Sequence, residues 1–144
     1  MSLEFPDIWY HGSNELFEKF EKSKIGSNFS KTSVGFYFTT IRKPPPFSSS
    51  AKEYAEDLVI RKGGKPYIYH CKLDLTDAMI VDAKGWYNAN AYIDLNRNDI
   101  LRWLKYESKE AFVAFEDMGD GYGLDAICLI LNPDLIEIIE VESL

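Results

Sequence analysis

The alternation of residue types between positions 66 and 75 limits how this chain can fold more than any other feature. Apolar or aromatic residues stand at every second position there: Tyr67, Tyr69, Cys71 and Leu73. Side chains of a strand point alternately to its two faces, so a period of two predicts a β-strand with one face turned to a core. The pair Gly63 and Gly64 separates this strand from the preceding segment. The chain must therefore contain a sheet.

Further strands are expected towards both ends of the chain, with helices between them. The strands are expected at 8–11, 34–39, 66–75, 78–81, 125–131 and 135–141, and the helices at 51–60, 99–106 and 108–115. Three consecutive prolines at 44–46 exclude a helix or a central strand just before the first helix. Residues 87–93 are too polar to assign, and 116–123 is expected to be a loop. Helices segregated from antiparallel strands favour an α+β fold over a doubly wound sheet.

Size and composition predict a single domain spanning residues 1–144. Hydrophobic residues make up 46% of the 144 positions, enough for an independent core. The chain has no apolar run near eighteen residues, so no membrane span is expected. A net charge of −7 disfavours broad contact with nucleic-acid backbones, which need clustered lysine and arginine. No signal-peptide pattern opens the sequence, so the cytoplasm is the expected compartment.

Cysteine and histidine usage argues against a metal site. Cys71 and Cys128 each lie within an apolar strand-like run, where a thiol behaves as a small hydrophobe, so both are expected to be buried and reduced. His70 is adjacent to Cys71 and would point to the opposite face of the strand. With two histidines and two cysteines in the chain, no zinc site is expected. No phosphate-binding glycine loop followed by Lys-Ser/Thr is present, which excludes that class of nucleotide triphosphatase.

Three short motifs predict a histidine, a glycine and two tyrosines on neighbouring elements. They are Trp-Tyr-His-Gly-Ser at 9–13, Gly-Phe-Tyr-Phe-Thr-Thr at 35–40 and Ala-Lys-Glu-Tyr-Ala at 51–55. A tyrosine face attracts a flat ring, and more strongly one with positive charge, as in nicotinamide. A glycine beside the histidine lets the backbone approach a carboxamide. The alternative interpretation is two core strands whose aromatic side chains pack together.

The order of these motifs resembles the diphtheria-toxin and poly-ADP-ribose-polymerase class of ADP-ribosyltransferases. Within that class, it looks most like the small domains of phage and mobile-element polyvalent proteins. The matching segments are 10–13, 17–20, 35–40, 51–55, 67–75, 79–82 and 130–136. The resemblance implies a split antiparallel β-sheet with peripheral helices and NAD lying across a cleft. It also implies a catalytic signature of histidine, tyrosine and an acidic residue.

Carried over residue by residue, the resemblance implies a binding site for NAD. His11 would hydrogen-bond the ribose hydroxyls, and Gly12 would hold the nicotinamide carboxamide through its backbone. Ser13 would belong to the same cofactor-binding segment. Tyr37 and Tyr54 would sandwich the nicotinamide ring.

Two positions depart from the family pattern. Some relatives have a serine three residues before the second tyrosine, where this chain has Ala51 with Ser50 beside it. The family spacing puts the third signature residue at Ile127, whereas Asp125 lies two residues earlier on the same face of the strand. Asp125 is therefore the expected catalytic carboxylate, since a negative charge beside the ribose stabilises the positive charge that develops there. Alternative carboxylates precede it in the sequence: Glu116, Asp117 and Asp120.

Three classes of function remain open on the sequence. The first is an NAD-dependent mono-ADP-ribosyltransferase that modifies a protein or nucleic-acid acceptor. The second is a catalytically silent module that binds NAD or ADP-ribose, which the missing glutamate favours. The third is a phage-type structural or interaction protein. Release of nicotinamide, binding without release, or neither would distinguish them.

Overall fold

The computed structural model describes residues 5–21, 35–40, 51–83, 89–117 and 124–144. Within these residues, two α-helices accompany a seven-stranded sheet. The strands are β1 (Trp9–Ser13), β2 (Phe36–Thr39), β3 (Tyr67–Leu73), β4 (Met79–Asp82), β5 (Ala111–Asp117), β6 (Leu124–Ile130) and β7 (Ile136–Ser143). The helices are α1 (Ala51–Lys62) and α2 (Ala89–Glu107). The α+β class expected from the sequence is confirmed.

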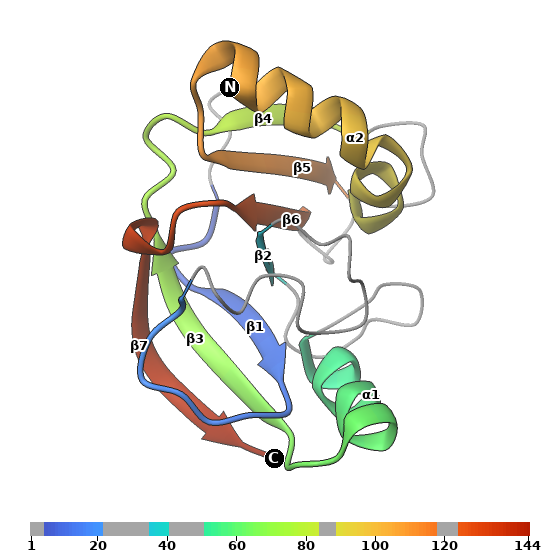
Figure 1. Cartoon of the computed structure of the whole chain (residues 1–144), viewed down its shortest axis with the longest axis vertical. Helices are drawn as coiled ribbons and strands as arrows, with labels where there is room; N and C mark the ends of the chain where they lie inside the picture. The colour runs from blue at the N-terminus through green and yellow to red at the C-terminus, as the bar shows by residue number, and fades with distance from the viewer. Residues whose placement is uncertain (1–4, 22–34, 41–50, 84–88, 118–123) are drawn as a thin grey trace.

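The sheet order is β4-β5-β6-β2-β1-β3-β7, which brings strands distant in sequence to its centre. In Figure 1, β1, β3 and β7 are steeply inclined in the lower half of the molecule, with β3 antiparallel to the other two, while β4, β5 and β6 lie across its upper half. β1 pairs with β3 over five residues and β2 pairs with β6 over four. Between β1 and β2, the described residues pair only at Tyr10 and Thr39. The two halves of the sheet therefore separate beyond that pair.

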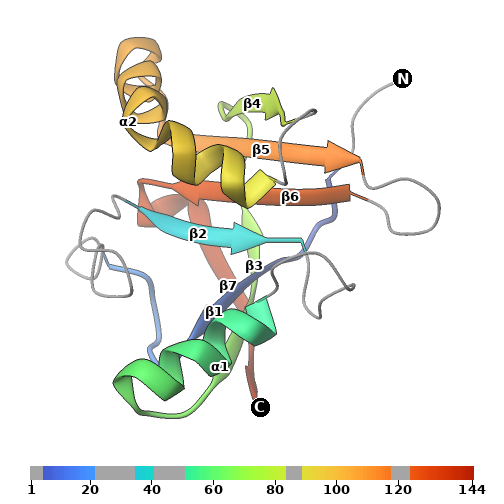
Figure 2. The same cartoon turned by 90° about the vertical axis from the view of Figure 1, so that its right-hand side faces the viewer.

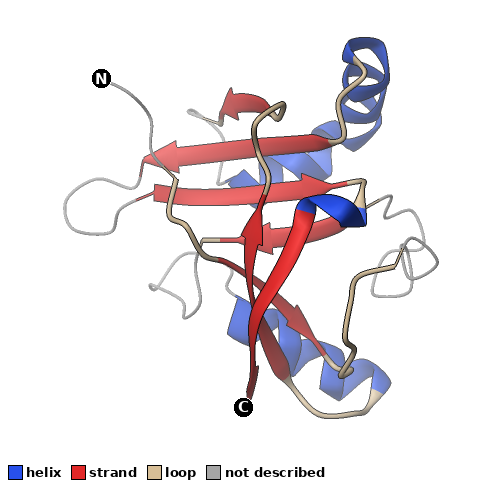
Figure 3. Cartoon of the chain, turned by 90° about the vertical axis from the view of Figure 1, so that its left-hand side faces the viewer, coloured by secondary structure: helices blue, strands red, loops and turns tan. Residues whose placement is uncertain are grey.

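Both helices cover the same face of the sheet, one at each end. Tyr10 and Thr39 are direct antiparallel partners, so they share a face, which Gly12 and Tyr37 also share by the period of two. Gly12 lies against the backbone of α1, and Tyr37 packs on the hydrophobic cluster beneath α2. The views from the two sides agree: the helices stand in front of the strands in Figure 2 and behind them in Figure 3.

The opposite face of the sheet carries an aromatic core. Its buried aromatic members are Trp9, Phe20, Phe36, Phe38 and Tyr69. The buried thiols of Cys71 and Cys128 belong to the same cluster, and both cysteines are free, as the sequence predicts. Burial raises the pKa of the Cys71 thiol to about 12, so this thiol stays protonated at neutral pH.

The structure corrects one predicted helix and the expectation that all strands pair antiparallel. The helix expected at 108–115 is largely replaced by β5, because Ala111 to Ala114 are all buried between α2 on one face and the aromatic core on the other. A strand buried on both faces loses the period of two that would identify it. α2 begins at Ala89, so it includes most of the segment left unassigned. The sheet is also mixed, since β4 runs parallel to β5.

Candidate functional site

A side chain links β1 and β2 where their backbone pairing ends. The Nδ1 atom of His11 lies 2.7 Å from the backbone oxygen of Tyr37. A carbonyl oxygen only accepts hydrogen bonds, so Nδ1 carries the proton and donates it. His11 is one residue past the Tyr10–Thr39 pair, so its imidazole bridges the two strands just where they begin to separate.

The imidazole of His11 is buried in the aromatic core, on the face opposite the Tyr37 phenol. Its ring centroid lies 4.9 Å from that of Phe20, 5.4 Å from that of Phe38 and 6.2 Å from that of Tyr69. Burial lowers the pKa of His11 to about 4, against a smaller opposing effect of the Tyr37 carbonyl. The ring is therefore neutral at physiological pH. Because Nδ1 holds the proton, Nε2 carries the lone pair and acts only as an acceptor.

Residues 14–21, which follow β1, are held over His11 by the hydroxyl of Tyr69. That hydroxyl donates to the backbone oxygen of Glu15 at 2.8 Å and accepts from the backbone nitrogen of Phe17 at 2.8 Å. The rings of Phe17 and Tyr69 stack with centroids 4.2 Å apart. Phe20 then reaches the edge of the His11 ring. Tyr69 thus positions the segment that covers the histidine, a role that sequence reasoning missed because it depends on pairing between β1 and β3.

Gly12 is required by the close approach of α1. A Cβ atom at this position would lie 2.3 Å from the backbone oxygen of Ala51 and 2.9 Å from the backbone nitrogen of Ala55. The side chain of Ser13 accepts a hydrogen bond from the backbone nitrogen of Glu15 at 3.1 Å, which begins the turn after β1. The first turn of α1 is therefore locked against β1 next to His11.

The two predicted ring-stacking tyrosines lie on different elements on the helix-covered side. Tyr37 is half-buried in β2, against the cluster under α2, whereas Tyr54 is on α1 with 37% of its surface exposed. Tyr54 is one residue before Ala55, the residue whose backbone meets Gly12. The predicted serine contact, Ser50, lies outside the described residues.

Asp125, the predicted catalytic carboxylate, is buried in β6 with 3% of its surface exposed. It lies directly opposite Glu116 of β5. Ile127, where the sequence resemblance puts the acidic signature residue, pairs with Thr39 of β2, and Asp125 shares that face. The Asp117 side chain and Asp120 lie outside the described part of the structure.

The edge of β2 is fixed beside Asp125 by Thr40. The backbone nitrogen of Thr40 donates to the backbone oxygen of Ala126 at 3.1 Å, and the Thr40 hydroxyl accepts from the backbone nitrogen of Ala126 at 3.0 Å. The pairing of β2 with β6 thereby extends past Thr39. This places Asp125 and Tyr37 on the same face of adjacent strands, with His11 on the other face.

A histidine–carboxylate pair lies on the helix-covered face of the neighbouring strands. The Nε2 atom of His70 lies 2.9 Å from Oε1 of Glu142, and the ring of Tyr10 meets the ring of His70 edge-on with centroids 5.0 Å apart. The alternation at 66–75 puts His70 on the face opposite Tyr69, so the sequence held a signal for its position. Only the tertiary structure identifies Glu142 as its partner.

The described residues include no group of three or more His, Cys, Asp or Glu side chains arranged to hold a metal ion. Neither helix of the described chain is long and apolar enough to cross a membrane. Comparisons with protein-family models, with curated proteins and with solved structures find no match to this chain.

Proposed function

We propose that this chain is an NAD-dependent mono-ADP-ribosyltransferase that modifies a protein or nucleic-acid acceptor. The observation that carries the proposal is the hydrogen bond between His11 and the Tyr37 backbone, where β1 and β2 separate. It joins two residues of the predicted histidine–tyrosine signature, which are 26 positions apart in the sequence. The short pairing of β1 with β2 supports the proposal, because the sequence resemblance implies a sheet that splits to admit NAD.

The state of the His11 ring suits contact with a ribose. A neutral imidazole with its proton on Nδ1 presents Nε2 as an acceptor, and sugar hydroxyls are donors that such an acceptor binds. A protonated ring would lose this ability. The aromatic neighbours keep the ring neutral well below physiological pH, so Nε2 keeps its lone pair. The ring is buried on the face opposite the Tyr37 phenol, so the proposal requires the ribose to reach it where β1 and β2 separate.

The proposed nicotinamide site lies on the side of the sheet that carries the helices. Tyr37 supplies a half-buried aromatic ring from β2, and Tyr54 supplies a partly exposed ring from α1. The contact of Gly12 with the first turn of α1 fixes the position of that helix relative to β1. A flat aromatic ring bound between two tyrosines gains stacking energy from both.

In the proposed reaction, the bond between the ribose C1′ and the nicotinamide nitrogen breaks with its electron pair leaving on nicotinamide. The acceptor nucleophile forms the new bond to C1′ and loses its proton to water or to a carboxylate. Positive charge develops on the ribose during this step, and a nearby carboxylate stabilises it. Asp125 is proposed for this role.

A second candidate is a module that binds NAD without cleaving it. Ile127 occupies the position of the family glutamate, and Asp125 is a shorter acid with almost no exposed surface. Both features should weaken stabilisation of the transition state more than they weaken binding of NAD in the ground state.

Incubation with NAD labelled in the nicotinamide ring tests the proposal and separates the two candidates. An enzyme releases nicotinamide, whereas a binding module shows heat of binding in calorimetry without release. His11→Asn should reduce either signal, because asparagine keeps a donor towards the Tyr37 carbonyl and lacks the Nε2 acceptor. Ile60→Ala, an exposed site on α1, is the matched control. Absence of both binding and release in the wild-type protein would reject both candidates.

A further inference from the structure

The outer face of α2 carries a stripe of four residues with a distinctive spacing. Leu95, Asp99, Arg102 and Tyr106 follow one another at intervals of four, three and four residues. At 3.6 residues per turn, this spacing keeps all four on one side of the helix. Ile93, Ile100 and Leu104, on the opposite side, are fully buried against the sheet. The stripe, called here the α2 stripe, therefore faces away from the domain.

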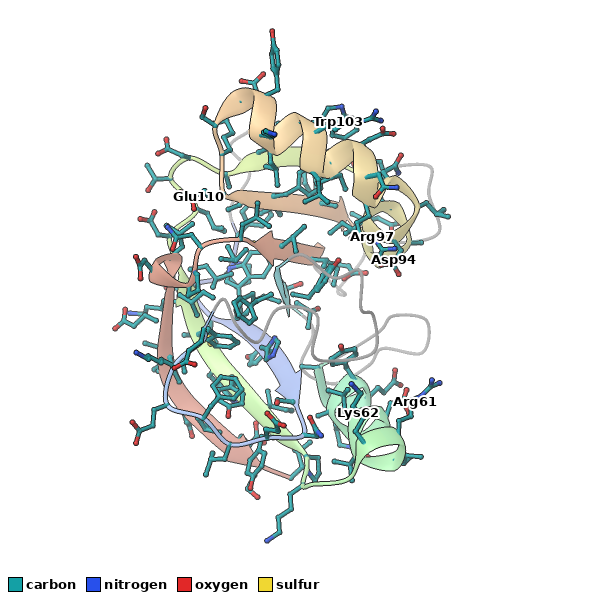
Figure 4. The ribbon with its side chains drawn as sticks, viewed as in Figure 1. Arg61, Lys62, Asp94, Arg97, Trp103 and Glu110 are labelled. Carbon is teal, nitrogen blue, oxygen red and sulfur yellow. The ribbon has the colours of Figure 1, made fainter. Side chains whose placement is uncertain are left out.

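The two ends of the α2 stripe are apolar and highly exposed. Leu95 exposes 67% of its surface and Tyr106 exposes 88%. Trp103 flanks the stripe with 39% exposed and points away from the sheet in Figure 4. Asp99 and Arg102 form an ion pair between the two apolar ends. Each of these apolar side chains alone is ordinary for a protein surface. The distinctive feature is their symmetric placement about the ion pair.

We propose that the α2 stripe binds a second copy of this chain, with the two α2 helices antiparallel about a two-fold axis between Ile100 and Leu101. Reversing the stripe about that point places Leu95 opposite the partner's Tyr106. It also places Asp99 opposite the partner's Arg102. Both relationships hold in each direction, which is the condition for a closed, two-fold symmetric contact.

The spacing of the α2 stripe and its charges both favour a second copy of this chain as the binding partner. Intervals of four and three residues form the contact seam of two helices packed at about 20° to each other. In the antiparallel arrangement, the Asp99–Arg102 ion pair of each helix meets the partner's pair with opposite charges facing each other, which makes a network of four alternating charges. A parallel arrangement in the same register would set Asp99 against the partner's Asp99. The charge pattern thus favours the antiparallel dimer over the parallel one.

The dimer should be weak. One helix pair buries less than the roughly 1,200 Å² at the low end of stable interfaces. The net charge of −7 on each copy adds repulsion, which salt screens beyond about 8 Å at physiological ionic strength. A dissociation constant between about 10 μM and 1 mM is expected, which is within reach of direct measurement.

Sedimentation equilibrium at 0.15 M salt, over a range of protein concentrations that reaches about 1 mM, tests the proposal. Arg102→Asp places two like-charge pairs across the axis and should weaken association by at least about tenfold. The double variant Asp99→Arg with Arg102→Asp restores opposite charges at both positions. It should associate within about threefold of the wild-type protein.

Two further variants show whether a change in association comes from the α2 stripe itself. Tyr106→Lys removes an apolar contact while placing a favourable charge in the last helical turn, so it should weaken association without loss of helix. Ile60→Asp, exposed on α1, should leave association unchanged. Helix content is followed by circular dichroism throughout. A wild-type protein that stays monomeric at about 1 mM, or a double variant as weak as Arg102→Asp, would overturn the proposal.

Discussion

Nδ1 of His11 donates to the backbone oxygen of Tyr37 across 2.7 Å, at the point where β1 and β2 stop pairing. A side chain thus supplies the link between two strands whose backbone pairing ends one residue earlier. The same bond determines which ring nitrogen is protonated, and burial among aromatic rings determines that the ring is neutral. The hydrogen bond therefore fixes the position and tautomer of His11, while burial fixes its charge.

Acid should destabilise the protein through His11. Its pKa falls from 6.5 to about 4 on folding, so between these values the unfolded chain binds a proton that the folded chain does not. The free energy of unfolding therefore drops as the pH falls through this window, by about 2 kcal/mol from this group between pH 7 and pH 5. Urea unfolding at both pH values measures it. His11→Asn should lose this part of the pH dependence, and an unchanged dependence would contradict the assignment.

Removal of the Tyr69 hydroxyl should loosen residues 14–21. Tyr69→Phe leaves the Phe17 nitrogen and the Glu15 oxygen without their partner, which should cost about 1–3 kcal/mol in the free energy of unfolding. Tyr67→Phe, two residues away on the same face, is the matched control, with an expected change within about 0.5 kcal/mol. Equal effects of the two variants would show that the hydroxyl does not hold the segment.

An alanine at position 12 should displace α1. Its Cβ would meet the backbone of Ala51 and Ala55, and backbone atoms cannot rotate away as a side chain can. Gly12→Ala should therefore destabilise the fold by about 1–3 kcal/mol. Gly63→Asn is the comparison, because Gly63 ends α1 with a φ of +82° and has open space around it, and asparagine tolerates that conformation. Similar stability of Gly12→Ala and wild type in urea would disprove the contact.

Under the proposed function, the Tyr37 ring contributes to NAD affinity. Tyr37→Phe keeps the ring and should bind NAD nearly as well as the wild-type protein, whereas Tyr37→Ala should bind about tenfold more weakly. Calorimetric titration of the three proteins gives the comparison, with thermal melts confirming that each is folded. Equal affinities of the alanine and phenylalanine variants would remove the Tyr37 ring from the site.

Asp125 distinguishes catalysis from binding. Asp125→Asn preserves size and most hydrogen-bonding capacity while removing the negative charge. If the carboxylate stabilises the charge that develops on the ribose, nicotinamide release should fall by at least about 100-fold, while NAD affinity changes little. Glu116→Gln, opposite it on β5, is the companion variant. If Asp125→Asn releases nicotinamide at the wild-type rate, another carboxylate must stabilise the charge on the ribose.

Local sequence patterns identified most of the secondary structure but not which elements pair. The alternation at 66–75 predicted β3, and the helical spacing at 99–106 predicted the second half of α2. β5 was predicted as a helix because Ala111 to Ala114 are buried on both faces, and continuous burial removes the signal that distinguishes a strand. β5 is a strand because it pairs with β4 and β6. β4 lies about thirty residues before it, and β6 follows just after it.

The sequence by itself determined the motif residues of the candidate site and the α+β class, because both depend on residue types and local periodicity. Only the tertiary structure decided that the His11 ring enters the aromatic core while the Tyr37 ring lies on the other face. The register of β1 against β2 rests on one residue pair, Tyr10 with Thr39. A shift of one residue in that pairing would move the side chains of one strand to the opposite face of the sheet. No pattern within either strand specifies the register. Long-range packing supplies that choice, through Phe20, Phe38 and Tyr69 around the imidazole.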